Sequence, residues 1–340
     1  MRRMASGTDG TIQHGGNLAR ARLQFSQAPE PWIDLSTGIN PYSYPHSAVP
    51  ANAFSRLPEP ALAERLKSLA AQAYGAPSAA HVVAAPGTQI LLPMIAALPK
   101  VQARAAVLSP TYAEHARAAR LAGYDVTETE DFGGLSAADL AVVVNPNNPT
   151  GRTTFRGDLL ALAAHMRSKG GLLVVDEAFQ DVSETESVAD AVADGALLVL
   201  RSFGKFYGMA GVRLGFAIAG ADVAARLDGQ LGPWSVSGPA LHVALEALAD
   251  RDWRQAMQQT LQRQAARLDA VLEDCAVPVV GGTSLFRYVR HERATELHAA
   301  LGEAGILVRR FEERQDFLRL GLPGDHEWDR LEAALRAIKL

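Results

Sequence analysis

The chain has 340 residues, of which 48% are hydrophobic and 21% charged, and its formal net charge is −4. This composition supports a sizeable globular core and allows two domains, and the mixed charges give no sign of a nucleic-acid-binding face. No apolar run reaches the roughly 18 residues that a membrane-spanning helix needs, and the single cysteine, Cys275, excludes an intrachain disulfide and fits a cytoplasmic location.

Residues 1–60 are rich in Pro, Gly, Ser and Asn and have no sustained periodicity, which predicts an extended arm. From residue 61 onward, apolar runs alternate with helical patterns. The predicted strands are 81–86, 104–110, 140–146, 171–179, 197–203 and 213–220, and the predicted helices are 61–74, one from about 88, 112–123 and 155–170. Near-continuous apolar runs separated by helices predict an α/β fold with a mostly parallel, seven-stranded-type sheet covered on both faces.

After about residue 222 long helices follow, at 239–250 and 251–274. A smaller unit then alternates strand and helix, with strands at 284–290, 306–311 and 317–323 and a last helix from about 326. We therefore expect an amino-terminal arm (1–45) that joins the small domain, a large domain (46–232) and a small α+β domain (233–340).

Ligands of open α/β sheets bind beyond the carboxyl ends of the strands, so the loops there are the first candidates for a site. Gly87, Thr88 and Gln89 follow the first strand and open a helix, which suits a phosphate, although an ordinary turn explains them too. The segment NPNNPTG (145–151) offers amide groups at another strand end, where a turn built from Asn, Pro and Gly is the alternative.

Three charged residues also stand at or near strands. Asp176 ends a buried strand, so it faces a cation or a protonated ring nitrogen unless it is partly solvated. Lys205, among glycines, is a candidate amine nucleophile, but also a possible surface lysine or, with Ser202, part of an S-x-x-K hydrolase motif whose S-D-N and K-T-G partners do not occur. Arg319 suits a carboxylate, although most strand arginines are surface residues.

Four segments occur in an ordered series: NPNNPTG, DEA (176–178), SFGK (202–205) and GVRLGF (211–216). In this order and spacing the chain resembles the fold-type-I pyridoxal-phosphate enzymes, the aspartate aminotransferase superfamily. The resemblance implies catalytic roles for Lys205, as Schiff-base lysine, and Asp176, as partner of the pyridine nitrogen. It further implies that Asn148 binds the phenolic oxygen, that Tyr112 stacks on the ring and that Arg319 holds the substrate's α-carboxylate. The implied phosphate cradle is Gly87, Thr88, Gln89, Ser202 and Arg213.

Within this superfamily the chain is similar to the histidinol-phosphate aminotransferase branch, and in it to the threonine-phosphate decarboxylases of cobalamin biosynthesis. The segment 14–42 carries this likeness, together with Phe179, which stands where many aminotransferases of the branch have a tyrosine. The resemblance implies that His14, Asn17 and Arg309, with Arg310 less directly, face a substrate phosphate, and that Asn148 also contacts substrate. A flexible glycine-rich arm is the alternative for HGGN (14–17).

The resemblance implies decarboxylation of L-threonine O-3-phosphate to (R)-1-amino-2-propanol O-2-phosphate. The alternatives are an aminotransferase for histidinol phosphate or a related amine, and a cofactor-binding module without turnover. A homodimer, a small phosphorylated amino acid as substrate and no metal are also implied. Leu57 departs from the branch, because a tyrosine that reaches the partner's cofactor phosphate usually stands there.

Overall fold

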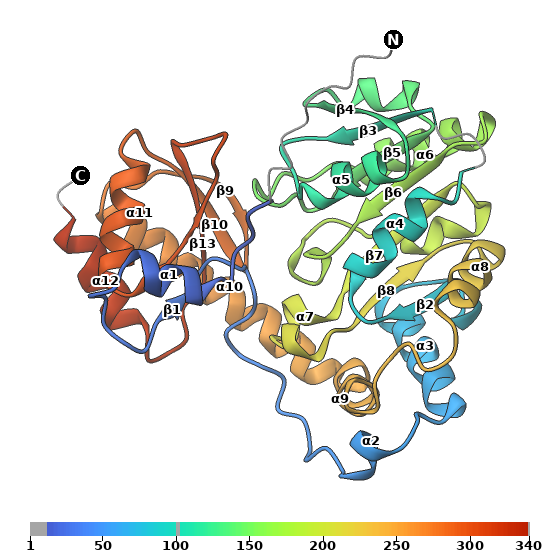
Figure 1. Ribbon diagram of the computed structural model, residues 1–340, viewed down its shortest axis with the longest axis horizontal. Coiled ribbons are helices and arrows are strands. Elements are labelled where there is room, and N and C mark those ends of the chain that lie inside the picture. The colour runs from blue at the N-terminus through green and yellow to red at the C-terminus, as the bar shows by residue number, and fades with distance from the viewer. Residues whose placement is uncertain (1–11, 100–102, 339–340) are drawn as a thin grey trace.

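The computed structural model describes residues 12–99 and 103–338, so the first part of the predicted arm lies outside the described residues. Two bodies stand side by side, and the long helix α10 (Arg251–Asp274) runs from one to the other (Figure 1). The arm, blue in Figure 1, passes from the smaller body to the larger one.

The larger body is built on a seven-stranded sheet with the order β2-β8-β7-β6-β5-β3-β4. Only β8 runs against its neighbours, so the predicted mostly parallel sheet is confirmed. The strands are β2 (Val82–Ala85), β3 (Arg104–Leu108), β4 (Asp125–Thr129), β5 (Leu140–Val144), β6 (Leu172–Asp176), β7 (Leu197–Ser202) and β8 (Gly215–Ile218).

Both faces of this sheet are buried under helices. Alternate residues of β5 and β6 enter two different core clusters, with Val143 and Val175 in one and Val142 and Val174 in the other. The first cluster includes residues of α3 (Pro60–Tyr74), α6 (Arg156–Ser168) and α9 (Gly238–Ala249), and the second includes residues of α4 (Leu91–Ala96), α5 (Glu114–Leu121) and α8 (Ala221–Leu231). Such burial explains why the strands read as continuous apolar runs.

The smaller body holds an antiparallel sheet of order β12-β13-β10-β9. Helices α11 (Ala294–Glu303) and α12 (Trp328–Ala337) lie beside the sheet, together with the end of α10 (Figure 1). The strands are β9 (Val279–Thr283), β10 (Phe286–Arg290), β12 (Arg309–Arg310) and β13 (Phe317–Gly321).

The arm is tied to this smaller body. It contains α1 (Leu18–Gln24) and β1 (Ile33–Asp34), and the one-turn helix α2 (Asn52–Ser55) follows it. Strand β1 pairs in parallel with β11 (Ile306–Leu307), and the Gly321 amide donates to the Leu35 carbonyl at 2.6 Å. The division of the chain at residues 45 and 232 stays a prediction.

Several elements differ from the sequence prediction. Strands β1 and β9 were not predicted, and the strand predicted at 306–311 is divided into β11 and β12. Strand β4 was not predicted, because four of its five residues are polar and they give no apolar run. The helix expected from residue 88 begins as a 3-10 turn, Thr88–Ile90, before α4. No helix among the described residues is long and apolar enough to cross a membrane.

Candidate active site

Lys205 lies just beyond the end of β7, on the one-turn helix α7 (Phe203–Phe206). Its Nζ donates to the Thr37 carbonyl of the arm at 3.3 Å and lies 5.7 Å from the centre of the Phe179 ring. Burial, with the nearby charge of Arg319, lowers the pKa of Lys205 to about 8. A desolvated amine of this kind is available as a nucleophile near neutral pH.

Asp176 ends β6, and only 6% of its surface is exposed. Its Oδ2 lies 2.8 Å from Nε2 of the buried His115, and its Oδ1 accepts the Ala178 amide at 3.0 Å. His115 in turn meets the Tyr112 ring edge-on at 5.9 Å. Sequence reasoning missed His115, because a polar residue at the start of a helix gives no local sign that it is buried.

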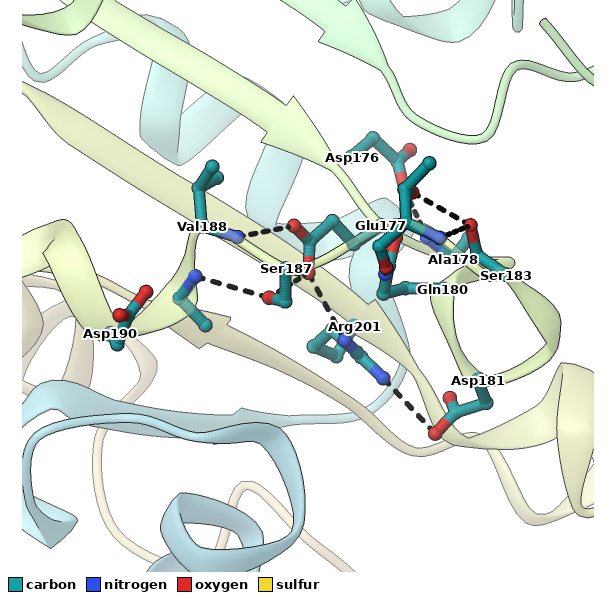
Figure 2. A network of polar contacts seen from close by, with 12 residues as sticks. Asp176, Glu177, Ala178, Gln180, Asp181, Ser183, Ser187, Val188, Asp190 and Arg201 are labelled. Carbon is teal, nitrogen blue, oxygen red and sulfur yellow. Dashed lines mark hydrogen bonds and ion pairs between the residues drawn. The ribbon is translucent and has the colours of Figure 1, made fainter. Parts of the chain in front are cut away.

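The neighbouring carboxylate, Glu177, points away from Asp176 into a buried ion network (Figure 2). The Arg201 guanidinium lies between Glu177 and Asp181, 3.0 Å from each carboxylate, and all three side chains are buried. Burial raises the pKa of Glu177, against the opposing effect of Arg201. Since Glu177 is occupied by Arg201, Asp176 is the carboxylate of this pair that can serve a ligand.

The predicted phosphate cradle comes together around Gly87. This glycine has φ +88°, a backbone conformation that favours glycine, and its Cα lies close to Nη2 of Arg213, which is 2.6 Å from where a Cβ would stand. Ser202 pairs with Gly215 across β7 and β8, and Gly215 packs against the Thr88 backbone. Gln89 follows in the same 3-10 turn. An open backbone position next to an arginine fits a phosphate group.

The asparagines of NPNNPTG divide into two kinds. Asn145 bonds Thr154, and Asn147 donates to Pro110 and Thr150 while accepting from Thr111, so both hold the loop in place. The Asn148 side chain instead accepts a hydrogen bond from Nη1 of Arg319. Only Asn148 is therefore placed toward the site residues.

Arg319 lies on β13 of the smaller body with 5% of its surface exposed. Its Nη2 donates to the Ser36 carbonyl of the arm at 2.6 Å, while its Nε has no partner within the described part of the chain. Burial and the nearby Arg309 lower the pKa of Arg319 to about 9. A buried guanidinium with an unsatisfied donor is suited to a carboxylate ligand.

The HGGN segment packs closely on the arm's own backbone. A Cβ at Gly15 would lie 2.3 Å from the Ser36 carbonyl oxygen, so the close approach requires glycine. Asn17 caps α1 by accepting the Arg20 amide at 3.0 Å, which leaves only its amide nitrogen for a ligand. The close packing of Gly15 and the cap formed by Asn17 explain these residues without a flexible arm.

A cavity of about 730 Å³ separates α1 from β11 and β12. Its lining includes three arginines and one carboxylate, so positive charge predominates: Arg20, Arg309, Arg310 and Glu312. His14, Asn17 and His298 also line it. Arg309 also donates to the Gln13 carbonyl, and Ser36 lines the same cavity next to Arg319. The residues predicted to face a substrate phosphate thus share one cavity beside the carboxylate-binding candidate.

Residues 30–338 match the family model of the class I and II aminotransferases. The chain belongs to the class I and II aminotransferase family. Two relatives of this family are threonine-phosphate decarboxylases. That of Sinorhizobium sp. is 43% identical over 97% of this chain and 99% of its own length, and that of Pseudomonas aeruginosa is 42% identical over 96% and 98%.

The aminotransferase fold is also found by comparison of structures. The crystal structure of histidinol-phosphate aminotransferase from Sinorhizobium meliloti in complex with pyridoxal 5'-phosphate superposes with a TM-score of 0.81. It is 19% identical, and the match covers 98% of this chain and 99% of that one. At this identity the likeness establishes the fold, and the predicted resemblance to fold-type-I enzymes is confirmed.

Proposed function

We propose that the chain is a pyridoxal-phosphate-dependent enzyme that decarboxylates L-threonine O-3-phosphate to (R)-1-amino-2-propanol O-2-phosphate and CO₂. The main support for the proposal is that the site offers two separate positions for anionic groups. Buried Arg319 suits the α-carboxylate, and the cavity lined by His14 and Arg309 suits a phosphate. The decarboxylases that share 42–43% of their residues with this chain support the same substrate.

The residues of the site fit pyridoxal phosphate. When bound, this cofactor supplies an aldehyde that takes up an amino group and a ring that accepts the electrons of a bond broken at Cα. Lys205 would hold the aldehyde, Asp176 would pair with the ring nitrogen and Asn148 with the phenolic oxygen. Gly87, Thr88, Gln89, Ser202 and Arg213 would hold the phosphate, and Tyr112 would cover the ring.

The chain's own residues would then direct the reaction at Cα. Arg319 would hold the carboxylate that leaves as CO₂, and its orientation would select the bond that breaks. Lys205, whose pKa is lowered to about 8, can release and return a proton near neutral pH, so its Nζ would deliver a proton to Cα after CO₂ departs. Buried Phe179 lies beside Lys205 without offering a hydroxyl group.

The proposal includes a homodimer in the cytoplasm. Large apolar side chains are exposed on the larger body, with Phe54 71%, Leu57 65% and Trp234 56% exposed. Exposed large apolar side chains favour an interface where they lie together. Sedimentation of the purified protein should give twice the chain mass, and Leu57→Ser should weaken the association. A monomer at micromolar concentration would remove this part of the proposal.

The purified holoenzyme should release CO₂ from L-threonine O-3-phosphate without any keto acid present. Serine phosphate and L-threonine serve as comparison substrates, and 2-oxoglutarate is added in a second series. Amino transfer to 2-oxoglutarate without CO₂ release would instead establish the alternative activity, an aminotransferase for histidinol phosphate or a similar amine. Membership of the class I and II aminotransferase family is the observation that favours this alternative.

A further inference from the structure

Glu114, at the first position of α5, is a buried carboxylate to which no role has been given so far. Only 5% of its surface is exposed. It lies 2.9 Å from Nε2 of His14 and accepts hydrogen bonds from Nε2 of Gln89 at 2.8 Å and from Nη1 of Arg117 at 3.1 Å. Burying a carboxylate costs free energy unless it is paired in this way. Glu114 is therefore not an ordinary solvent-facing polar residue of the helix.

Glu114 connects two parts of the predicted site. Gln89 belongs to the phosphate cradle and also accepts the Tyr112 hydroxyl at 3.0 Å. His14 belongs to the arm, lines the cationic cavity and lies 5.8 Å from the Tyr112 ring. The carboxylate therefore joins the arm to the cofactor side at the point where both approach Tyr112.

We propose that Glu114 is a positioning residue that fixes His14 for the substrate's phosphate and so selects phosphorylated over unphosphorylated amino acids. The inference rests on the proposed function. When the carboxylate accepts a hydrogen bond from Nε2–H, the His14 ring is left with Nδ1 for a ligand. Nδ1 can donate only when the ring is charged, and a charged donor suits a phosphate dianion better than a hydroxyl group.

The charge on Glu114 is part of this role. Burial raises its pKa, but the hydrogen bonds from His14, Arg117 and Gln89 outweigh burial, and the net shift is downward. The group is thus an anion near neutral pH. An anion repels a nearby phosphate unless donors or cations offset it. His14 lies between Glu114 and the cavity, which Arg309 and Arg310 also line.

The test uses the holoenzyme with Glu114→Gln, which keeps the size but removes the charge. We expect KM for L-threonine O-3-phosphate to rise roughly ten- to a hundredfold, the range for losing a charged hydrogen bond, with kcat and the cofactor's absorbance unchanged. KM for L-threonine should change by less than about twofold. His14→Ala should give a similar loss, and the double variant should be no worse than His14→Ala alone.

Arg117→Gln is the matched control, because Arg117 contacts the same carboxylate from the exposed side of the helix. It should leave KM for threonine phosphate within about twofold of wild type. Three outcomes would overturn the proposal. In Glu114→Gln they are an equal rise in KM for L-threonine and threonine phosphate, or loss of the cofactor. The third is an additive rise in KM when Glu114→Gln and His14→Ala are combined.

Binding measured by calorimetry separates this inference from the proposed function. If the wild type transfers amino groups instead of releasing CO₂, the decarboxylase proposal falls. The affinities of threonine phosphate and L-threonine for wild type and Glu114→Gln still test Glu114, since they require no turnover. A phosphate-specific loss of affinity supports its role, and a loss common to both ligands contradicts it.

Discussion

The cofactor side and the substrate side of the site are built differently. Lys205 and Asp176 follow the buried strands of the large sheet, and Asp176 is held by a partner, His115, that is itself buried. On the substrate side, the His14 side chain is 45% exposed, and Arg319 and Arg309 are held by carbonyl groups of the arm. Changes on the cofactor side should therefore strongly alter either the chemistry or the stability, while changes on the substrate side should alter mainly affinity.

The largest effect is expected on the cofactor side from Lys205→Ala. Loss of the amine that moves the proton should lower kcat/KM for threonine phosphate by roughly 10²- to 10⁴-fold. The cofactor's absorbance should also change, while the melting temperature should not fall. Lys169→Ala, at an exposed lysine, is the control. Full activity of Lys205→Ala would contradict the whole assignment of the site.

Stability on the cofactor side is tested by Arg201→Met. This change leaves Glu177 and Asp181 buried without their shared cation, so the free energy of unfolding should fall by about 3–5 kcal/mol. Urea unfolding measures the loss. Arg120→Met breaks an exposed pair with Glu128 and should lower the free energy by less than about 1 kcal/mol. Equal losses of unfolding free energy in the two variants would show that burial of the network does not increase its contribution to stability.

Lys205 should also make stability depend on pH in the cofactor-free protein. Burial and Arg319 lower its pKa from 10.5 to about 8, so between these values the unfolded chain binds a proton that the folded chain has lost. The free energy of unfolding should rise with pH across this window by at most about 3 kcal/mol relative to Lys205→Met. A flat or falling difference between wild type and variant would be evidence that Lys205 is solvated.

The substrate side should respond more mildly, as Arg319→Lys tests. The variant keeps the charge but loses the planar fork that bonds Asn148 and Ser36 and that we propose binds the substrate's carboxylate. KM for threonine phosphate should rise roughly ten- to a hundredfold, with the melting temperature nearly unchanged. Arg290→Lys, on an exposed pair, is the control. A collapse of stability instead would place Arg319 in the folding core and weaken the contrast between the two sides.

Much of the cofactor side was predictable, because the end of an apolar run in the sequence marks the end of a buried strand. The sequence predicted Asp176 and Lys205 from their places after buried runs, and the structure puts both beside the same site. His115 and Glu114 were missed because a polar residue at a helix start usually faces solvent, and nothing local reveals that these two are buried.

The substrate side was harder to predict because its contacts are remote in the sequence. The arm has no periodicity from which to derive a pairing, so its contacts with β11 and Arg319 could not be deduced from pattern alone. Resemblance placed His14, Asn17 and Arg309 near one another, and the cavity that they line agrees with that placement. The cap that Asn17 forms on α1 follows from the ordinary preference for Asn at that position.

The pairing of β1 with β11 has a consequence for synthesis of the chain on the ribosome. Ile33 is among the early residues to emerge, yet its partner Ile306 is made only near the end. Because chains fold as they emerge, the large sheet can form first, while the arm must wait for its partner strand. The proposed substrate side is therefore completed last, so that a chain interrupted before residue 306 lacks the strand that anchors its arm.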